Sequence, residues 1–196
     1  MKAVENCFEC GVNVVTVYAL SIENFNRPQA QVRALFELLH DFITQYSDSD
    51  RTFAIRLLGR PEMLPDDLRY RLEKIAGKIR HPKQNVLNIC IAYTSRDEMT
   101  TAVRKTVEEH QPQEEIMEES LTRNMFTTDS PPLDILIRTS AVWRLSDFLL
   151  WQCHQDTYIE VVDTLWPAFG MWDLFWILLK WQRIRASSDT GCCKSL

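Results

Sequence analysis

Residues 12–20 read Val-Asn-Val-Val-Thr-Val-Tyr-Ala-Leu, and this nearly continuous run of β-branched and apolar side chains decides the fold class. Such a run predicts a strand that is buried on both faces, as the strands of parallel sheets are. A loop is expected over residues 21–27, and Pro28 then suits the first turn of a helix. Apolar side chains recur there every three or four residues, which predicts one apolar helix face made of Val32, Leu35, Phe36, Leu39, Phe42, Ile43 and Tyr46.

The alternation of strand and helix continues along the rest of the chain. Further strands are predicted over residues 53–58, 86–92, 133–137 and 159–162, and further helices over residues 64–79, 97–110, 114–126, 146–152 and 172–183. Strands that alternate with helices form right-handed crossovers and a parallel sheet. The sequence therefore predicts an α/β fold, a single domain with a parallel sheet flanked by helices.

The composition limits the kinds of partner. The chain has 196 residues, of which 45% are hydrophobic and 25% charged, as in an ordinary globular domain. Its net charge of −5 argues against a nucleic acid as partner, because nucleic-acid binding needs a basic face. No segment reaches the roughly 20 apolar residues that span a bilayer. The tryptophan-rich residues 165–181 nevertheless suit a membrane surface or a partner protein.

Polar side chains gather directly after the predicted strands. They include Asn24, Arg27, Arg96, Arg138, Arg144 and Ser146. Ligands of open parallel sheets bind beyond the carboxyl ends of the strands. Since the guanidinium fork matches the oxygens of a phosphate, this pattern is typical of a site for a small phosphorylated ligand. Structural ion pairs between these arginines and nearby carboxylates explain the same pattern equally well.

Two long segments resemble the motifs of one family, the cis-prenyltransferases. Residues 15–28 (VTVYALSIENFNRP) are similar to its strand-to-loop motif, and residues 137–152 (IRTSAVWRLSDFLLWQ) resemble its diphosphate-binding signature. Shorter matches at residues 59–65, 92–98 and 165–167 follow in the family's order. The resemblance covers about residues 11–182 and is closest to the eukaryotic dehydrodolichyl diphosphate synthases. It implies the α/β fold already predicted and a transferase of prenyl groups.

The resemblance implies roles for several polar side chains. Arg138, Arg144 and Ser146 would hold the diphosphate of isopentenyl diphosphate, and Glu160 would help to bind Mg²⁺. The interpretation of Glu160 that needs no function is a surface glutamate on a strand. The metal and the arginines would stabilise negative charge on a departing diphosphate.

A second group of residues is assigned in the same way. Asn24 would position the reacting groups, which makes it the candidate catalytic residue, while Arg27 and Phe25 would contact an allylic diphosphate of the farnesyl type. The implied activity joins isopentenyl diphosphate to that allylic diphosphate and yields a long-chain cis-polyprenyl diphosphate for dolichol synthesis. The expected setting is the cytoplasmic face of the endoplasmic reticulum membrane, with peripheral attachment. A homodimer or heterodimer is expected, with residues 114–126 and the tryptophan-rich segment as its candidate surfaces.

Two departures from the family pattern affect these expectations. The opening strand and aspartate-bearing loop of the family have no counterpart before residue 11, so we expect a domain over residues 1–185 without its first strand, impaired activity, and a flexible tail over residues 186–196. The alternative function is that of a non-catalytic partner subunit, although a scaffold has no need of the retained arginines. Ala141 stands at a position where many members have glycine, and we expect it to strain its loop.

Overall fold

The structure of the protein is a computed structural model that describes residues 2–46, 52–76, 84–110, 115–154 and 156–191. Within these ranges the chain forms two compact units. The larger unit comprises residues 12–131 and 147–151, and the smaller unit comprises residues 1–11, 132–146 and 152–196.

The larger unit is built on a parallel sheet in the order β1-β3-β2. Its strands are β1 (Val14–Tyr18), β3 (Asn85–Ile91) and β2 (Phe53–Gly59). The central strand β3 is buried along nearly its whole length, as a strand with neighbours on both sides should be. The prediction for β1 is wrong in one respect, because all five of its residues are only half-buried. In the described sheet β1 is an edge strand, and an edge strand has a neighbour on one side only.

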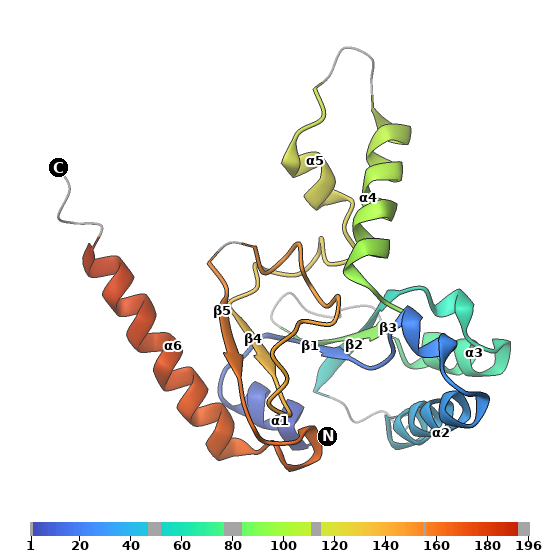
Figure 1. Ribbon diagram of the computed structural model, residues 1–196, viewed down its shortest axis with the longest axis horizontal. Coiled ribbons are helices and arrows are strands. Elements are labelled where there is room, and N and C mark those ends of the chain that lie inside the picture. Colours follow the sequence, from blue (N-terminus) through green and yellow to red (C-terminus); the bar gives the residue numbers. More distant parts are fainter. Residues whose placement is uncertain (1, 47–51, 77–83, 111–114, 155, 192–196) are drawn as a thin grey trace. The chain divides into compact units, whose positions relative to one another are not determined.

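Among the described residues of this unit, four α-helices accompany the sheet: α2 (Gln29–Tyr46), α3 (Asp66–Ile75), α4 (Ser95–Glu109) and α5 (Glu118–Arg123). The predicted apolar face of α2 is confirmed, since Leu39 and Ile43 are buried while Leu38, outside that face, is 65% exposed. The helices α4 and α5 run side by side (Figure 1) and are joined by a hydrogen bond from Thr106 Oγ1 to the carbonyl of Ser120.

The smaller unit contains a two-stranded parallel sheet. Strand β4 (Ile135–Arg138) pairs with β5 (Tyr158–Val161), and the helices α1 (Lys2–Glu9) and α6 (Met171–Gly191) complete the unit. Its core is formed by Phe169, Leu174 and Ile177, which pack against apolar side chains of α1, β4 and β5. No helix in the described ranges is long and apolar enough to cross a membrane.

The predicted fold class, α/β with parallel strands flanked by helices, is confirmed. The described strands form two parallel sheets, whereas one was predicted.

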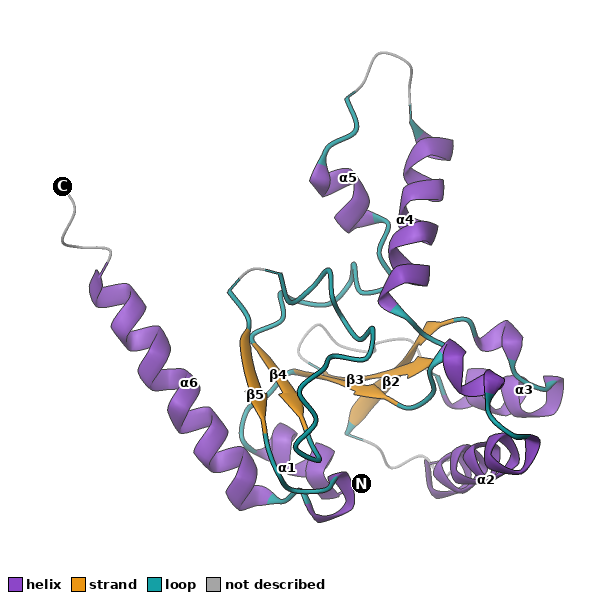
Figure 2. Cartoon of the chain, in the orientation of Figure 1, coloured by secondary structure: helices purple, strands orange, loops and turns teal. Residues whose placement is uncertain are grey.

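The prediction of a helix over residues 146–152 is wrong, since the connection between β4 and β5 contains no helix in its described part (Figure 2). Positive φ angles at Ser146, Asp147 and Leu149 explain this, because a right-handed helix cannot pass through them. Helix α6 continues to Gly191, into the segment predicted as a flexible tail, and residues 192–196 lie outside the described residues.

Candidate diphosphate site

The segment after β1 carries the first group of predicted site residues. Ile22–Asn26 forms a short 3-10 helix, η1, in place of the predicted loop. Ser21 caps it, because its Oγ accepts a hydrogen bond from the amide of Glu23 at 3.1 Å, while Asn24 Oδ1 accepts one from the amide of Ser21 at 2.9 Å. This reciprocal cap fixes the side chain of Asn24 through its oxygen and leaves the NH₂ end of the amide as the donor.

Phe25 and Arg27 flank Asn24 in different environments. The Phe25 ring is half-buried and lies 6.2 Å, centroid to centroid, from the ring of Phe36 on α2. Arg27 is exposed, and its amide donates to the carbonyl of Asn24 at 3.1 Å, which ends η1. An exposed guanidinium beside a fixed amide and an aromatic ring can hold an anion that has an apolar tail.

Backbone hydrogen bonds join the residues that follow β1 to the residues that follow β3. The amide of Tyr93 donates to the carbonyl of Leu20 at 3.1 Å, and the amide of Ile22 donates to the carbonyl of Tyr93 at 3.3 Å. The hydroxyl of Tyr93 is buried and donates to Glu98 at 2.5 Å. Burial and the neighbouring Glu98 carboxylate raise the pKa of Tyr93 well above its ordinary value. Tyr93 and Glu98 therefore support the segments after β1 and β3 from inside the unit.

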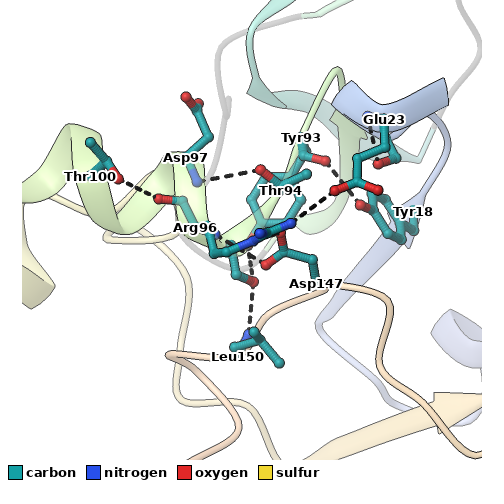
Figure 3. A network of polar contacts seen from close by, with 11 residues as sticks. Tyr18, Glu23, Tyr93, Thr94, Arg96, Asp97, Thr100, Asp147 and Leu150 are labelled. Carbon is teal, nitrogen blue, oxygen red and sulfur yellow. Dashed lines mark hydrogen bonds and ion pairs between the residues drawn. The ribbon is translucent and has the colours of Figure 1, made fainter. Parts of the chain in front are cut away.

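A network of charged side chains surrounds the start of α4 (Figure 3). Arg96 lies between two carboxylates, Glu23 on η1 and Asp147, to which its nitrogen atoms donate at 2.8 Å and 2.7 Å. The hydrogen bond to Asp147, followed by the charges of Asp147 and Glu23, raises the pKa of Arg96. The sequence left a phosphate ligand and a structural ion pair open for Arg96, and the structure shows that Arg96 forms ion pairs. Its two partners were missed, because they lie 73 and 51 residues away along the chain.

The smaller unit carries the second group of predicted site residues, in the loop that follows β4. Arg138 ends β4, and its carbonyl accepts a hydrogen bond from the amide of Val162 at 2.8 Å. The Nε of Arg138 is buried and has no hydrogen-bond partner among the described residues. Arg144 and Ser146 are exposed in the same loop. A buried donor without a partner carries a free-energy cost that a bound anion would remove.

The backbone of this loop is held in an unusual conformation. The amides of Ser140 and Ala141 donate to the carbonyls of Thr164 and Val162, and both residues have positive φ angles, +72° and +52°. The left-handed region is costly for any residue with a Cβ atom. The expected strain at Ala141 is thus borne out by its φ angle.

We therefore expect the Ala141→Gly variant to be more stable than the unchanged protein by about 0.5–1 kcal/mol, since glycine removes the strain but has more freedom when unfolded. Thermal unfolding would show a rise in Tm of about 2 °C. The control is Ala34→Gly in the exposed part of α2, which should lose about 1 kcal/mol instead. Equal losses in both variants would contradict the strain at Ala141.

Glu160, the predicted magnesium ligand, lies on β5 within a cluster of its own. Lys180 on α6 donates to one of its oxygens at 2.5 Å, and the hydroxyl of Tyr158 donates to the other. Burial acts to raise the pKa of Glu160, but the hydrogen bonds from Lys180 and Tyr158 outweigh it and lower the pKa. Burial and Glu160 together raise the pKa of Tyr158 to about 12. No pattern in the sequence pointed to Lys180, which lies 20 residues away.

This environment does not fit a magnesium ligand. Mg²⁺ is held by carboxylates together with water and substrate phosphates, whereas the Glu160 carboxylate is already neutralised by an ammonium group. No group of three or more potential metal-binding side chains occurs among the described residues. The metal role of Glu160 remains a prediction, and no chemical step is derived through it.

The Glu160 cluster makes a testable contribution to stability. A carboxyl group with a lowered pKa stabilises the fold above its ordinary value of 4.5, and the contribution is lost as the pH falls through the lower folded value. At pH 7 the unfolding free energy of the Glu160→Gln variant should be about 1.5 kcal/mol lower than that of the unchanged protein. On acidification, the unfolding free energy of the variant should fall by less than that of the unchanged protein. Urea unfolding from pH 7 to pH 3 measures this, with the exposed Glu115→Gln as control. Parallel pH curves for Glu160→Gln and the unchanged protein would contradict the assignment.

Comparison with known proteins gives these two groups of residues a context. The profile of the prenyltransferase family described as "Putative undecaprenyl diphosphate synthase" matches residues 1–188. A dehydrodolichyl diphosphate synthase complex subunit from Schizosaccharomyces pombe is 37% identical over 90% of this chain and 70% of its own length. The human subunit of the same complex is also 37% identical, over 90% of this chain, but the match spans only 55% of the human protein.

A solved structure shows the same fold. The crystal structure of a probable undecaprenyl diphosphate synthase from Campylobacter jejuni superimposes with a TM-score of 0.80, at 28% identity, over 91% of this chain and 84% of that one. The profile match over nearly the whole chain, the sequence identity and this superposition agree with one another. The chain belongs to the undecaprenyl diphosphate synthase family of prenyltransferases.

Proposed function

We propose that this protein is a prenyltransferase that joins isopentenyl diphosphate to an allylic diphosphate of the farnesyl type and makes a long-chain cis-polyprenyl diphosphate for dolichol synthesis. The observation that carries the proposal is Arg138, whose Nε is buried without a hydrogen-bond partner among the described residues at the carboxyl end of β4. Membership of the family and the dehydrodolichyl diphosphate synthase subunits among the relatives support it.

The residues of the loop after β4 suit the diphosphate of isopentenyl diphosphate. Arg138 and Arg144 would each donate two hydrogen bonds to phosphate oxygens, and Ser146 would add a hydroxyl donor. A diphosphate carries its charge over several oxygens, so a fork from each arginine fixes its orientation as well as its position. This arrangement would fix the orientation of the isopentenyl double bond.

The segment after β1 would receive the allylic diphosphate. In the reaction, the carbon–oxygen bond between the allylic chain and its diphosphate breaks and diphosphate leaves. The isopentenyl double bond attacks the electron-poor carbon, a new carbon–carbon bond forms, and a proton is lost. Arg27 would stabilise the charge on the leaving diphosphate, Asn24 would orient the reacting groups, and Phe25 would line the pocket. These roles follow from the resemblance and from the positions of Asn24 and Phe25 on η1 and of Arg27 directly after it.

We also propose that the protein works as a dimer, either with a second copy or with a different subunit. The relatives from fission yeast and human are named as subunits of a complex, which supports an assembly. The second candidate function, a non-catalytic partner subunit, is favoured by that observation, whereas Arg138 favours the catalytic one. Mass photometry of the purified protein, alone and with a candidate partner, would separate a homodimer from a heterodimer.

Peripheral attachment to the endoplasmic reticulum membrane completes the proposal. The product of the proposed reaction is a lipid, and exposed aromatic side chains lie along α6, among them Trp172, which is 75% exposed, and Trp176. A fluorescent fusion of the protein in a eukaryotic cell would test the location.

Equilibrium dialysis with labelled isopentenyl diphosphate tests the proposed site. We expect saturable binding that is competed by inorganic pyrophosphate. Binding should be kept in a variant with an exposed arginine of α6 replaced, Arg183→Ala, and lost in Arg144→Ala. Absence of binding, or equal binding by Arg144→Ala, would contradict the proposed function.

A further inference from the structure

The contacts of Arg96 are too many for an ordinary surface ion pair. Its side chain is 69% exposed, yet Nε donates to Asp147 Oδ2 at 2.7 Å, its backbone amide donates to Asp147 Oδ1 at 3.1 Å, and a terminal nitrogen donates to Glu23 at 2.8 Å (Figure 3). The Asp147 side chain is only 12% exposed. One arginine therefore holds both oxygens of a nearly buried carboxylate and a second carboxylate on another element.

Asp147 is fixed from its backbone as well. Its carbonyl accepts a hydrogen bond from the amide of Ser95 at 2.8 Å, and the Ser95 hydroxyl accepts one from the amide of Leu150 at 2.8 Å. The segment 147–150 is thus fastened to the first turn of α4 by two backbone contacts and by Arg96. The φ angle of +61° at Asp147 lies in the left-handed region, which costs free energy in a residue with a Cβ atom, and these contacts offset that cost.

The two carboxylates stand next to residues of the proposed site. Glu23 directly precedes Asn24 on η1, and Asp147 directly follows Ser146 in the chain. We propose that Arg96 is a positioning residue: by holding Glu23 and Asp147 together, it fixes η1 and the end of the loop that carries Arg144 and Ser146. This inference rests on the proposed function, since it assigns to Arg96 the ordering of segments next to the residues proposed to bind the substrates.

The exposure of Arg96 and Glu23 limits what this contact contributes to global stability, since exposed ion pairs contribute little. Its effect should appear instead in how rigidly residues 21–27 and residues 144–150 are held. We expect the Arg96→Ala variant to keep its Tm within about 2 °C and to bind isopentenyl diphosphate about fivefold more weakly. Its amide hydrogen exchange should increase in peptides that cover residues 21–27 and 144–150.

Three further variants make the test specific. Arg96→Lys should restore part of the affinity, because lysine keeps the charge but cannot reach both carboxylates with a fork. Glu23→Gln should weaken binding less than Arg96→Ala, and the double variant should be no weaker than Arg96→Ala alone, since both changes break the same contact. The control is Arg104→Ala on the exposed face of the same helix, which should change neither affinity nor exchange.

Calorimetric titration with isopentenyl diphosphate and hydrogen exchange by mass spectrometry measure these effects. Unchanged affinity and unchanged exchange in Arg96→Ala would overturn the inference, as would additive losses in the double variant. If the unchanged protein does not bind isopentenyl diphosphate, the proposed function fails. Hydrogen exchange then decides the positioning role by itself: increased exchange in both peptides supports it, and increased exchange in neither or in only one refutes it.

Discussion

The Arg138→Ala variant is expected to bind isopentenyl diphosphate about 100-fold more weakly than the unchanged protein. Two charge-assisted hydrogen bonds to a diphosphate are lost, and each contributes about 1.5–3 kcal/mol. The 100-fold loss of affinity is therefore a lower estimate. The buried Nε of Arg138 makes the effect specific, because water cannot readily replace the guanidinium at that position. Titration calorimetry with isopentenyl diphosphate measures the change.

Two variants control for charge and for folding. Arg138→Lys should show an intermediate loss, since the ammonium group keeps the charge but not the fork. Arg183→Ala removes an exposed arginine of α6 in the same unit and should leave the affinity unchanged. If Arg138→Ala binds as tightly as the unchanged protein, the assignment of the diphosphate to the loop after β4 is wrong.

The Gly59→Ala variant is expected to lose about 4 kcal/mol of unfolding free energy. Gly59 ends β2 with a φ angle of +108°, and a Cβ atom there would lie 2.3 Å from the carbonyl oxygen of Ile91 and 3.2 Å from that of Ala92. Both are backbone atoms, and the oxygen of Ile91 already accepts a hydrogen bond from the amide of Arg60 at 2.9 Å. The clash can be relieved only by distorting the pairing of β2 with β3.

Thermal unfolding followed by circular dichroism would show this loss as a fall in Tm of about 10 °C. Gly170→Ala is the matched control, because the nearest atom to its Cβ would be 3.8 Å away, an ordinary contact. Should Gly59→Ala be insoluble, its yield relative to Gly170→Ala from parallel refolding replaces the melting curve. Equal stability of the two variants would show that the end of β2 tolerates a side chain.

The sequence was sufficient for the regular elements because burial and periodicity determine them locally. The apolar run of residues 86–92 became the buried strand β3, and the three- and four-residue spacing from Val32 to Ile43 became α2. It was not sufficient for residues 146–152, whose composition suits a helix. There the chain takes positive φ angles, and contacts with Ser95 and Arg96 hold it in place. Such contacts depend on residues about 50 positions away, which local patterns do not reveal.

The candidate site was predictable as a set of residues but not as a set of contacts. The positions of Asn24, Arg27, Arg138 and Arg144 at or beyond the ends of strands followed from the alternation of elements and from the resemblance. The two interpretations that the arginine pattern left open each apply to part of it. Arg96 forms ion pairs, whereas the Nε of Arg138 has no partner among the described residues. Only the structure separates these cases.

Incorporation of labelled isopentenyl diphosphate into long-chain product, with farnesyl diphosphate and Mg²⁺ present, tests the central claim most directly. It should be measured for residues 1–196 and for a chimaera that joins this chain to the part of the fission yeast relative that the match does not cover, because the match spans 70% of that protein. We expect the chimaera to extend farnesyl diphosphate by many five-carbon units, little or no product from residues 1–196 alone, and none from the chimaera with Arg138→Ala. A chimaera that forms no product, or that forms it equally well with Arg138→Ala, would contradict the proposed catalytic function.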